Sequence, residues 1–232
     1  MESIRVLALL LGIASLGLLP QQAMAQRSFG SRSNSLISIA ANDLVQKELS
    51  ISGDGAKRLS GLNDEYRAAS QKEFTAMGID YSAISDLPQA ERAVEMRRVN
   101  EKTAEVTRKL TAEFMPKLVE LVTADQMLRL KQIQLQANGL EAWTEPEWAA
   151  LLGVNDDQRQ KLESLKTEYA RRQQSLDGDF QQRFARMREL SAERDKKGQD
   201  VLSADQRTKL IALQGAPFDV SQLGFGRRRN NN

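Results

Sequence analysis

The sequence predicts an all-α protein of long antiparallel helical hairpins, arranged in two tandem repeat halves. Charged residues make up 28% of the 232 residues and aromatic residues only 5%, a composition typical of amphipathic helices. Apolar residues recur at helical spacing over long stretches of the chain. A helix-start motif occurs four times, and such repetition indicates a repeat architecture.

The motif places an apolar residue before a capping Ser, Thr or Asn, with Gln three positions after the cap. The capping side chain accepts a hydrogen bond from an unpaired backbone N–H, and the Gln side chain reaches back to the cap. The predicted caps and their Gln positions are Ser52 with Gly55 in place of Gln, Thr123 with Gln126, Asn155 with Gln158, and Ser203 with Gln206.

The spacing of the copies indicates an internal duplication. Ser52 and Asn155 lie 103 residues apart, and the pattern Leu-x-x-Leu-x-x-Glu-Tyr follows both at that offset. Thr123 and Ser203 pair separately at an offset of 80. The alternative, that any helix start has this pattern, does not explain the shared positions. We therefore expect a first half over 37–140 and a second half over 141–216, packed as an intramolecular pseudo-dimer.

Residues 1–25 have the features of a secretory signal peptide. Arg5 precedes an apolar run over 6–19, and Ala23-Met24-Ala25 supplies small residues for cleavage. A membrane anchor is disfavoured because a spanning helix needs roughly 20 apolar residues. The chain is thus expected in the periplasm or secreted, with no membrane span after cleavage. We expect a flexible linker over 26–36 and a disordered basic, Asn-rich tail over 217–232.

The first half is expected to start with a short helix over 37–49 and a long helix over 54–77. A second long helix follows from about residue 88, with its apolar residues at helical spacing. Thr123 begins the closing helix, and Asn138-Gly139 is a helix stop signal.

The second half opens with two tryptophans. Thr144 and Glu147 are expected to form a capping box, with Trp143 and Trp148 as the hydrophobic staple around it. The alternative is that the tryptophans form a ligand platform or an interface anchor.

The long helical stretch from Asp156 to about Lys196 has two interpretations. Asp177-Gly178-Asp179 is a turn, with Asp179 capping a returning helix, or the helix runs unbroken because the apolar phase continues across Gly178. We favour the turn because the first half also folds back. Ser203 then begins the final helix, which ends at Gln214-Gly215.

The chain contains no Cys and no His. Their absence removes disulfides, thiolate zinc sites and the usual nucleophile and base pairs. The acids at 156–157 and 177–179 are better explained by the helix dipole than by a metal. We therefore expect no catalytic, cofactor or metal site and no enzyme activity. The net charge of +2 also gives no reason to expect nucleic-acid binding.

Two motif copies, Val122-Thr123-Ala124-Asp125-Gln126 and Leu202-Ser203-Ala204-Asp205-Gln206, resemble the LTxxQ-motif family of Spy/CpxP-like exported helical proteins. The duplicated layout, with Gln-Gly-Ala-Pro-Phe-Asp after the last motif, resembles a branch common in planctomycete-type bacteria. The resemblance implies curved helical hairpins that pair as antiparallel dimers. It also implies binding of unfolding envelope proteins without ATP, or restraint of an envelope-stress sensor kinase.

We accordingly expect an exported binding protein, chaperone-like or stress-related, whose partners are unfolded or envelope proteins. It would act as a monomeric pseudo-dimer or as a homodimer. A structural envelope scaffold without client binding is the alternative. A client surface needs apolar residues beside charges, and the candidates are Arg171, Arg172, Phe180, Phe184 and Met187. The same residues also fit an ordinary core-facing stripe with a solvated back.

Overall fold

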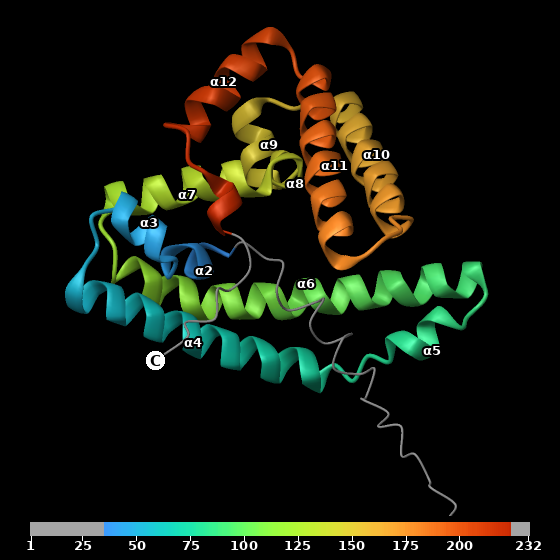
Figure 1. The fold of residues 1–232 in the computed structure, drawn as a ribbon, viewed down its shortest axis with the longest axis horizontal. Helices are drawn as coiled ribbons and strands as arrows, with labels where there is room; N and C mark the ends of the chain where they lie inside the picture. Colours follow the sequence, from blue (N-terminus) through green and yellow to red (C-terminus); the bar gives the residue numbers. More distant parts are fainter. Residues whose placement is uncertain (1–34, 224–232) are drawn as a thin grey trace, which may run out of the picture. The chain divides into compact units, whose positions relative to one another are not determined.

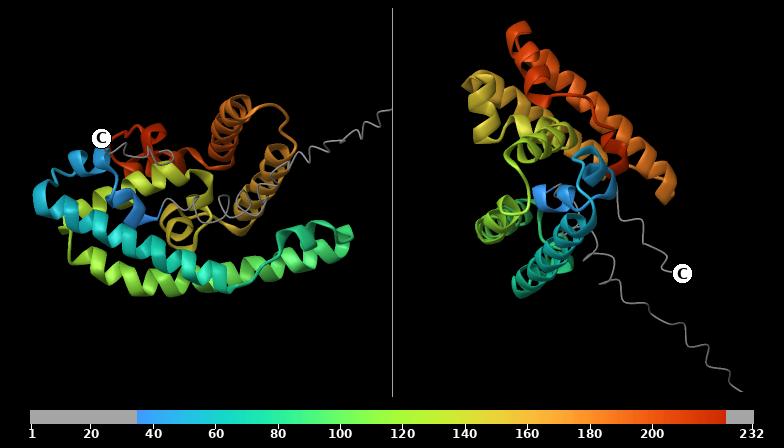
Figure 2. Two further views of the ribbon diagram at one scale, coloured as in Figure 1. Left: turned by 60° about the horizontal axis from the view of Figure 1, so that its bottom comes forward. Right: turned by 90° about the vertical axis from the view of Figure 1, so that its left-hand side faces the viewer.

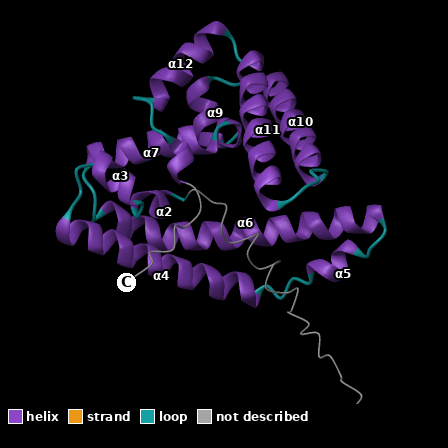
Figure 3. Ribbon diagram, viewed as in Figure 1, coloured by secondary structure: helices purple, strands orange, loops and turns teal. Residues whose placement is uncertain are grey.

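The computed structural model describes residues 35–223, except the side chains of Gln174, Phe180 and Gln222. In this range the chain forms eleven α-helices and one 3-10 helix, with no strand (Figures 1 and 3). The all-α class is therefore confirmed. The predicted signal peptide, nearly all of the predicted linker and residues 224–232 lie outside the described residues. No helix within 35–223 is long and apolar enough to cross a membrane.

The first half is built around the long pair α4 and α6, which lie side by side (Figure 2). Two short helices replace the single helix expected over 37–49, because Asn42 interrupts it and caps the second by accepting from Leu44 N at 2.9 Å. The helices are α2 (Leu36–Ala40), α3 (Asp43–Glu48), α4 (Gly53–Ala76), α5 (Tyr81–Ser85), α6 (Gln89–Val119) and α7 (Ala124–Asn138).

The second half is built around the pair α10 and α11, which also pack against each other, with no helix between them in the described part of the chain to correspond to α5. Its helices are α8 (Leu140–Trp143), α9 (Pro146–Leu152), α10 (Asp156–Gln174), α11 (Phe180–Val201) and α12 (Ala204–Gln214). The turn interpretation at Gly178 is confirmed and the unbroken helix is wrong. Gly178 has φ +115°, which favours glycine, and Asp179 caps α11 by accepting from Gln182 N at 2.9 Å.

Two apolar clusters form the core of this part of the chain. The first lies where α2, α3, α4, α6 and α7 meet, and the second joins α8, α9, α10 and α12. Helix α7 contributes to both, since Ile133 packs in the first cluster and Leu135 in the second. The long hairpins are thus anchored at one end by these clusters.

The expected capping box at Thr144 and Glu147 is wrong. Thr144 ends α8 and donates its hydroxyl to Glu141 O at 3.1 Å, while α9 starts after Glu145 without a side-chain cap. Pro146 explains the shift, because its fixed φ suits the first helical position and it has no N–H to satisfy.

Trp143 and Trp148 are both buried in the second cluster, at 1% and 8% exposure. The staple is wrong in its geometry, since Trp148 is the third residue of α9 and not the fourth helical position after Thr144. Neither indole forms an exposed ligand platform. Both tryptophans are core residues.

The predicted disordered tail begins too early. Residues 220–223 form the 3-10 helix η1 (Val220–Leu223), which packs against α7, and Phe218 and Leu223 pack against the first cluster. Gln136 fixes this segment, because it accepts from Phe218 N at 2.8 Å and donates to Gln214 O at 2.7 Å. Composition alone missed these two apolar anchors.

Candidate binding surface on the second hairpin

Three of the four predicted motif copies form complete capping boxes. Thr123, Asn155 and Ser203 each accept from the backbone N–H of the Gln three positions later, at 3.2, 2.8 and 3.2 Å. The Gln side chains return bonds to the cap N–H groups at 2.9, 3.2 and 2.8 Å. These three predictions are confirmed.

The fourth copy is degraded in the structure as in the sequence. Ser52 precedes α4 as predicted, but its side chain makes no capping hydrogen bond. Gly55 has no side chain that could reach back to the cap. This helix start therefore has neither of the two side-chain bonds that define a capping box.

The motif Gln residues also tie helices together, which the sequence did not predict. Gln158 and Gln206 exchange amide hydrogen bonds of 2.7 and 3.0 Å across the bases of α10 and α12. Gln206 further donates to Gly153 O at 2.8 Å, and Gln126 donates to Leu49 O at 3.0 Å. The motif residues are thus engaged in structural bonds at the base of each half.

The candidate client residues differ in their exposure and in their partners. Arg172 is turned into the α10–α11 seam, where it forms two hydrogen bonds of 3.2 and 3.1 Å to Glu193. Arg171 is exposed, whereas Phe184 and Met187 are half-buried on α11. Phe180 begins α11, and its side chain lies outside the described residues. Arg172 therefore links α10 to α11.

Tyr169 contributes to the same link between α10 and α11. Its hydroxyl donates to Glu193 Oε1 at 2.7 Å, and the Arg172 guanidinium lies over its ring at 4.6 Å from the centroid. Hydrogen bonds from Arg172 and then Tyr169 lower the pKa of Glu193 to about 2. These contacts hold the last turns of α10 against α11.

An open groove of about 590 Å³ lies between α10 and α11, nearer their base. Leu165 and Val201 supply its apolar residues, and both are partly buried against the second cluster. Its rim carries charges of both signs. The polar lining residues are Gln160, Lys161, Ser164, Glu168, Lys197 and Asp200. The groove is open to solvent along its length, so it could contact one face of an extended segment but would not enclose a small ligand.

Sequence reasoning missed this groove. Leu162 and Leu165 share the apolar stripe of α10, yet Leu162 is 0% exposed and Leu165 only partly buried. In the same way, Leu202 is buried whereas the neighbouring Val201 is only partly buried. The sequence signal for the groove is the apolar stripe of α10, which carries more apolar residues than the neighbouring helices cover.

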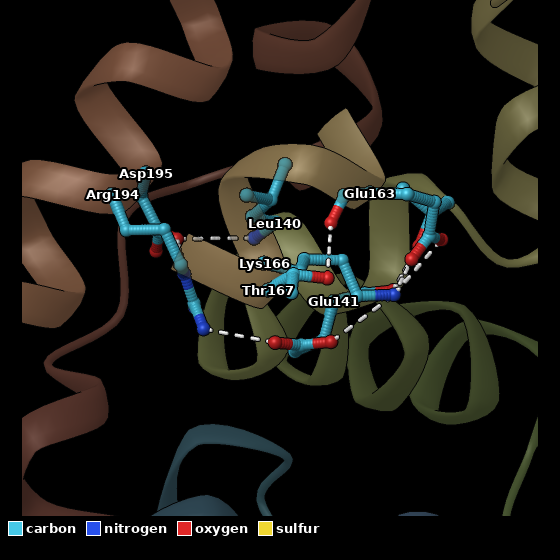
Figure 4. Close-up of polar contacts among 8 residues, drawn as sticks. Leu140, Glu141, Glu163, Lys166, Thr167, Arg194 and Asp195 are labelled. Carbon is cyan, nitrogen blue, oxygen red and sulfur yellow. Dashed lines mark hydrogen bonds and ion pairs between the residues drawn. The ribbon is translucent and has the colours of Figure 1, made fainter. Parts of the chain in front are cut away.

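A charged network docks the hairpin on α8 (Figure 4). Glu141 of α8 pairs with Arg194 of α11 at 2.9 Å and with Lys166 of α10 at 3.3 Å. Asp195 accepts from Leu140 N at 3.2 Å. Burial raises the pKa of the Asp195 carboxyl, and the neighbouring Arg194 opposes that rise.

No group of three or more Asp or Glu side chains within 35–223 is placed to hold a metal ion. Comparison of the chain with protein-family models, curated proteins and solved structures gives no match.

Proposed function

We propose that this protein is an exported, ATP-independent binding protein of the chaperone type, related to the Spy-like LTxxQ-motif proteins. In this proposal the α10–α11 groove binds an apolar segment of an unfolded envelope protein. The observation that carries the proposal is the groove itself, with Leu165 and Val201 between rims of mixed charge.

The chemistry of the groove suits such a client. An apolar side chain leaving water gains about 25 cal/mol per Å² of buried area, and Leu165 and Val201 offer that contact. Lys161 and Lys197 attract acidic residues of the client, while Glu168 and Asp200 attract basic ones. An open, shallow site of this kind favours weak binding and release without an energy source.

We further propose that the two halves are a tandem duplication that forms a pseudo-dimer. Residues 103 apart occupy matching positions: Asn42 and Glu145 precede α3 and α9, and Ser50 and Gly153 follow those helices with φ of 55° and 71°. Gln126 donates to Leu49 O and Gln206 donates to Gly153 O. The offset of 103 relates Leu49 to Leu152, which is the neighbour of Gly153.

The test measures light scattering of a reduced, aggregating client protein without ATP. The unmodified protein should suppress aggregation near a one-to-one ratio. Ser164→Phe, which adds an aromatic ring to the groove wall, should remove most of that suppression. Gly61→Phe is the matched control, because Gly61 lies 103 residues earlier and a Cβ added there meets nothing within 4 Å.

No suppression by the unmodified chain at several-fold excess would contradict the chaperone proposal and favour a structural envelope role. Equal loss in Ser164→Phe and Gly61→Phe would place client binding outside this groove.

A further inference from the structure

We infer that the α10–α11 hairpin is a movable arm that ion pairs hold against α8. Raised ionic strength moves the hairpin away from α8 and exposes the apolar face of Leu140 and Trp143. In the closed state α11 itself covers this face. The inference concerns the motion of the arm and does not depend on client binding.

The first argument is the chemistry of the docking contact. Arg194, Glu141 and Lys166 join three helices through ion pairs, with side chains that are 13%, 50% and 23% exposed, so solvent reaches the pairs at Glu141. Exposed ion pairs are weak and are screened by salt, whose Debye length falls from about 10 Å at 0.1 M to about 3 Å at 1 M. The contact that closes the arm is therefore sensitive to ionic strength.

The corresponding contact in the first half has no such network. The offset of 80 relates Arg194 and Asp195 to Phe114 and Met115 of α6. Phe114 is 2% exposed within the first cluster, and Met115 packs against that cluster. Helix α6 is thus docked by apolar contact at these positions, whereas the second hairpin adds a charged network to the apolar contacts of Leu162 and Leu165.

The second argument is that α11 meets α8 beneath the network through its backbone at Gly198, whereas the fully buried apolar contact of the hairpin is made by Leu162 at the base of α10. Gly198 presents no side chain, and a Cβ there would lie 2.9 Å from Leu140 Cδ1 and from Trp143 Cζ3. Trp143 is 1% exposed, yet its indole Nε1 has no hydrogen-bond partner among the described residues. A buried unpaired donor opposes closure, because opening would return it to water.

The third argument is that the hairpin stays intact when it leaves α8. Tyr169, Arg172 and Glu193 link α10 to α11 without any residue of α8. At the base, the paired amides of Gln158 and Gln206 hold the start of α10 to the start of α12. These bonds keep the base fixed while the contact with α8 opens.

The chain offers a direct reporter, since it contains two tryptophans. In Trp148→Phe the remaining Trp143 reports the α8 face. The full chain, expressed with its own N-terminal segment, is measured by fluorescence and acrylamide quenching in 50 mM and 1 M NaCl. We expect a red shift and an at least twofold larger quenching constant at 1 M NaCl.

The matched variant carries Arg194→Phe and Asp195→Met, the residues found at the corresponding positions of α6. In the Trp148→Phe background it should lose the response to salt. Equal protection of Trp143 at both salt concentrations, or an unchanged response in the matched variant, would overturn the inference.

Hydrogen exchange on the unsubstituted chain provides an independent measurement. Amides of residues 190–198 should exchange several-fold faster at 1 M NaCl, while those of 110–118 in α6 should not. Equal acceleration in both segments would mean general loosening and would also overturn the inference. Neither measurement needs a client, so failure here is distinct from failure of the proposed function.

Discussion

Each hairpin pairs two long helices, α4 with α6 and α10 with α11, but the contacts between the paired helices differ. Tyr66 on α4 packs edge-on against Phe114 of α6, with ring centroids 5.4 Å apart. Tyr169 lies 103 residues later on α10, but it donates to Glu193 of α11. The tyrosine thus makes an apolar contact in one half and a charge-assisted hydrogen bond in the other. Ion pairs also join α4 to α6, from Lys109 to Glu73 and from Lys117 to Glu65, but they lie beside the aromatic contact rather than on the tyrosine.

The two halves also differ in which helix carries the large residue where a short helix meets a long one. Ala40 of α2 and Leu118 of α6 are both fully buried in the first half. Under the proposed duplication, the corresponding positions are Trp143 of α8 and Gly198 of α11, which approach closely. The larger residue of each pair is thus Leu118 on the long helix α6 in the first half and Trp143 on the short helix α8 in the second. Close packing explains this, because interiors tolerate swaps that conserve total volume.

The largest expected effect tests this exchange. Trp143→Ala should lower the free energy of unfolding by about 3–5 kcal/mol, and Gly198→Leu by about 1–3 kcal/mol through overpacking. The double variant, which copies the first half, should cost clearly less than the sum. Urea denaturation followed by circular dichroism measures all three. Additive costs would show that the two positions do not share one space.

A smaller effect is expected from the motif amides. Gln206→Ala removes the bonds to Gly153 O and to Gln158, leaves the Gln158 amide without its partner, and should cost about 1–3 kcal/mol. Gln126→Ala should cost less, because Gly55 offers no amide to pair with Gln126. Thermal unfolding compares the two variants, with exposed Gln71→Ala as control. Equal losses would contradict the role given to the amide pair.

The pH dependence should differ in sign between two carboxyls of α11. The pKa of Glu193 is lowered to about 2 from 4.5, so its contribution to stability is present above pH 4.5 and is lost as the pH falls towards 2. The advantage of the unsubstituted chain over Glu193→Gln in melting temperature should vanish over that window. Glu113→Gln, at the corresponding position in α6, is the control.

The pKa of Asp195 is instead raised by burial. The folded state then binds a proton more readily than the unfolded state, so acidification through this pKa stabilises the folded state. Relative to Asp195→Asn, the unsubstituted chain should gain stability on acidification. A loss in the same direction as for Glu193 would show that the Arg194 charge outweighs burial.

The smallest effect concerns the turns after α3 and α9. Ser50 has φ +55° and Gly153 has φ +71°, a region that favours glycine. Gly153→Ser should therefore cost about 1 kcal/mol, and Ser50→Gly should change stability by less than about 0.5 kcal/mol, because strain relief is offset by greater freedom of the unfolded chain. Melting temperatures measure both. A large loss in Ser50→Gly would mean that the Ser50 side chain has a role of its own.

The sequence by itself determined the helical class, the helix starts after Thr123, Asn155 and Ser203, and the break at Gly178. These features depend on bonds between residues three or four positions apart, or on the backbone freedom of one glycine. Such interactions are encoded by neighbouring residues, so the sequence pattern predicts them. Where two local signals competed, as at Thr144 and Pro146, the pattern alone chose the wrong start.

Only the tertiary structure decided which polar and apolar groups meet over long distances in the chain. It pairs Gln158 with Gln206, turns Arg172 onto Glu193, and leaves Leu165 at the groove while it buries Leu162. A helical stripe states that a face is apolar, but not which part of it a neighbour covers. Coverage and charge pairing depend on how separate helices are placed, and that placement is absent from any local pattern.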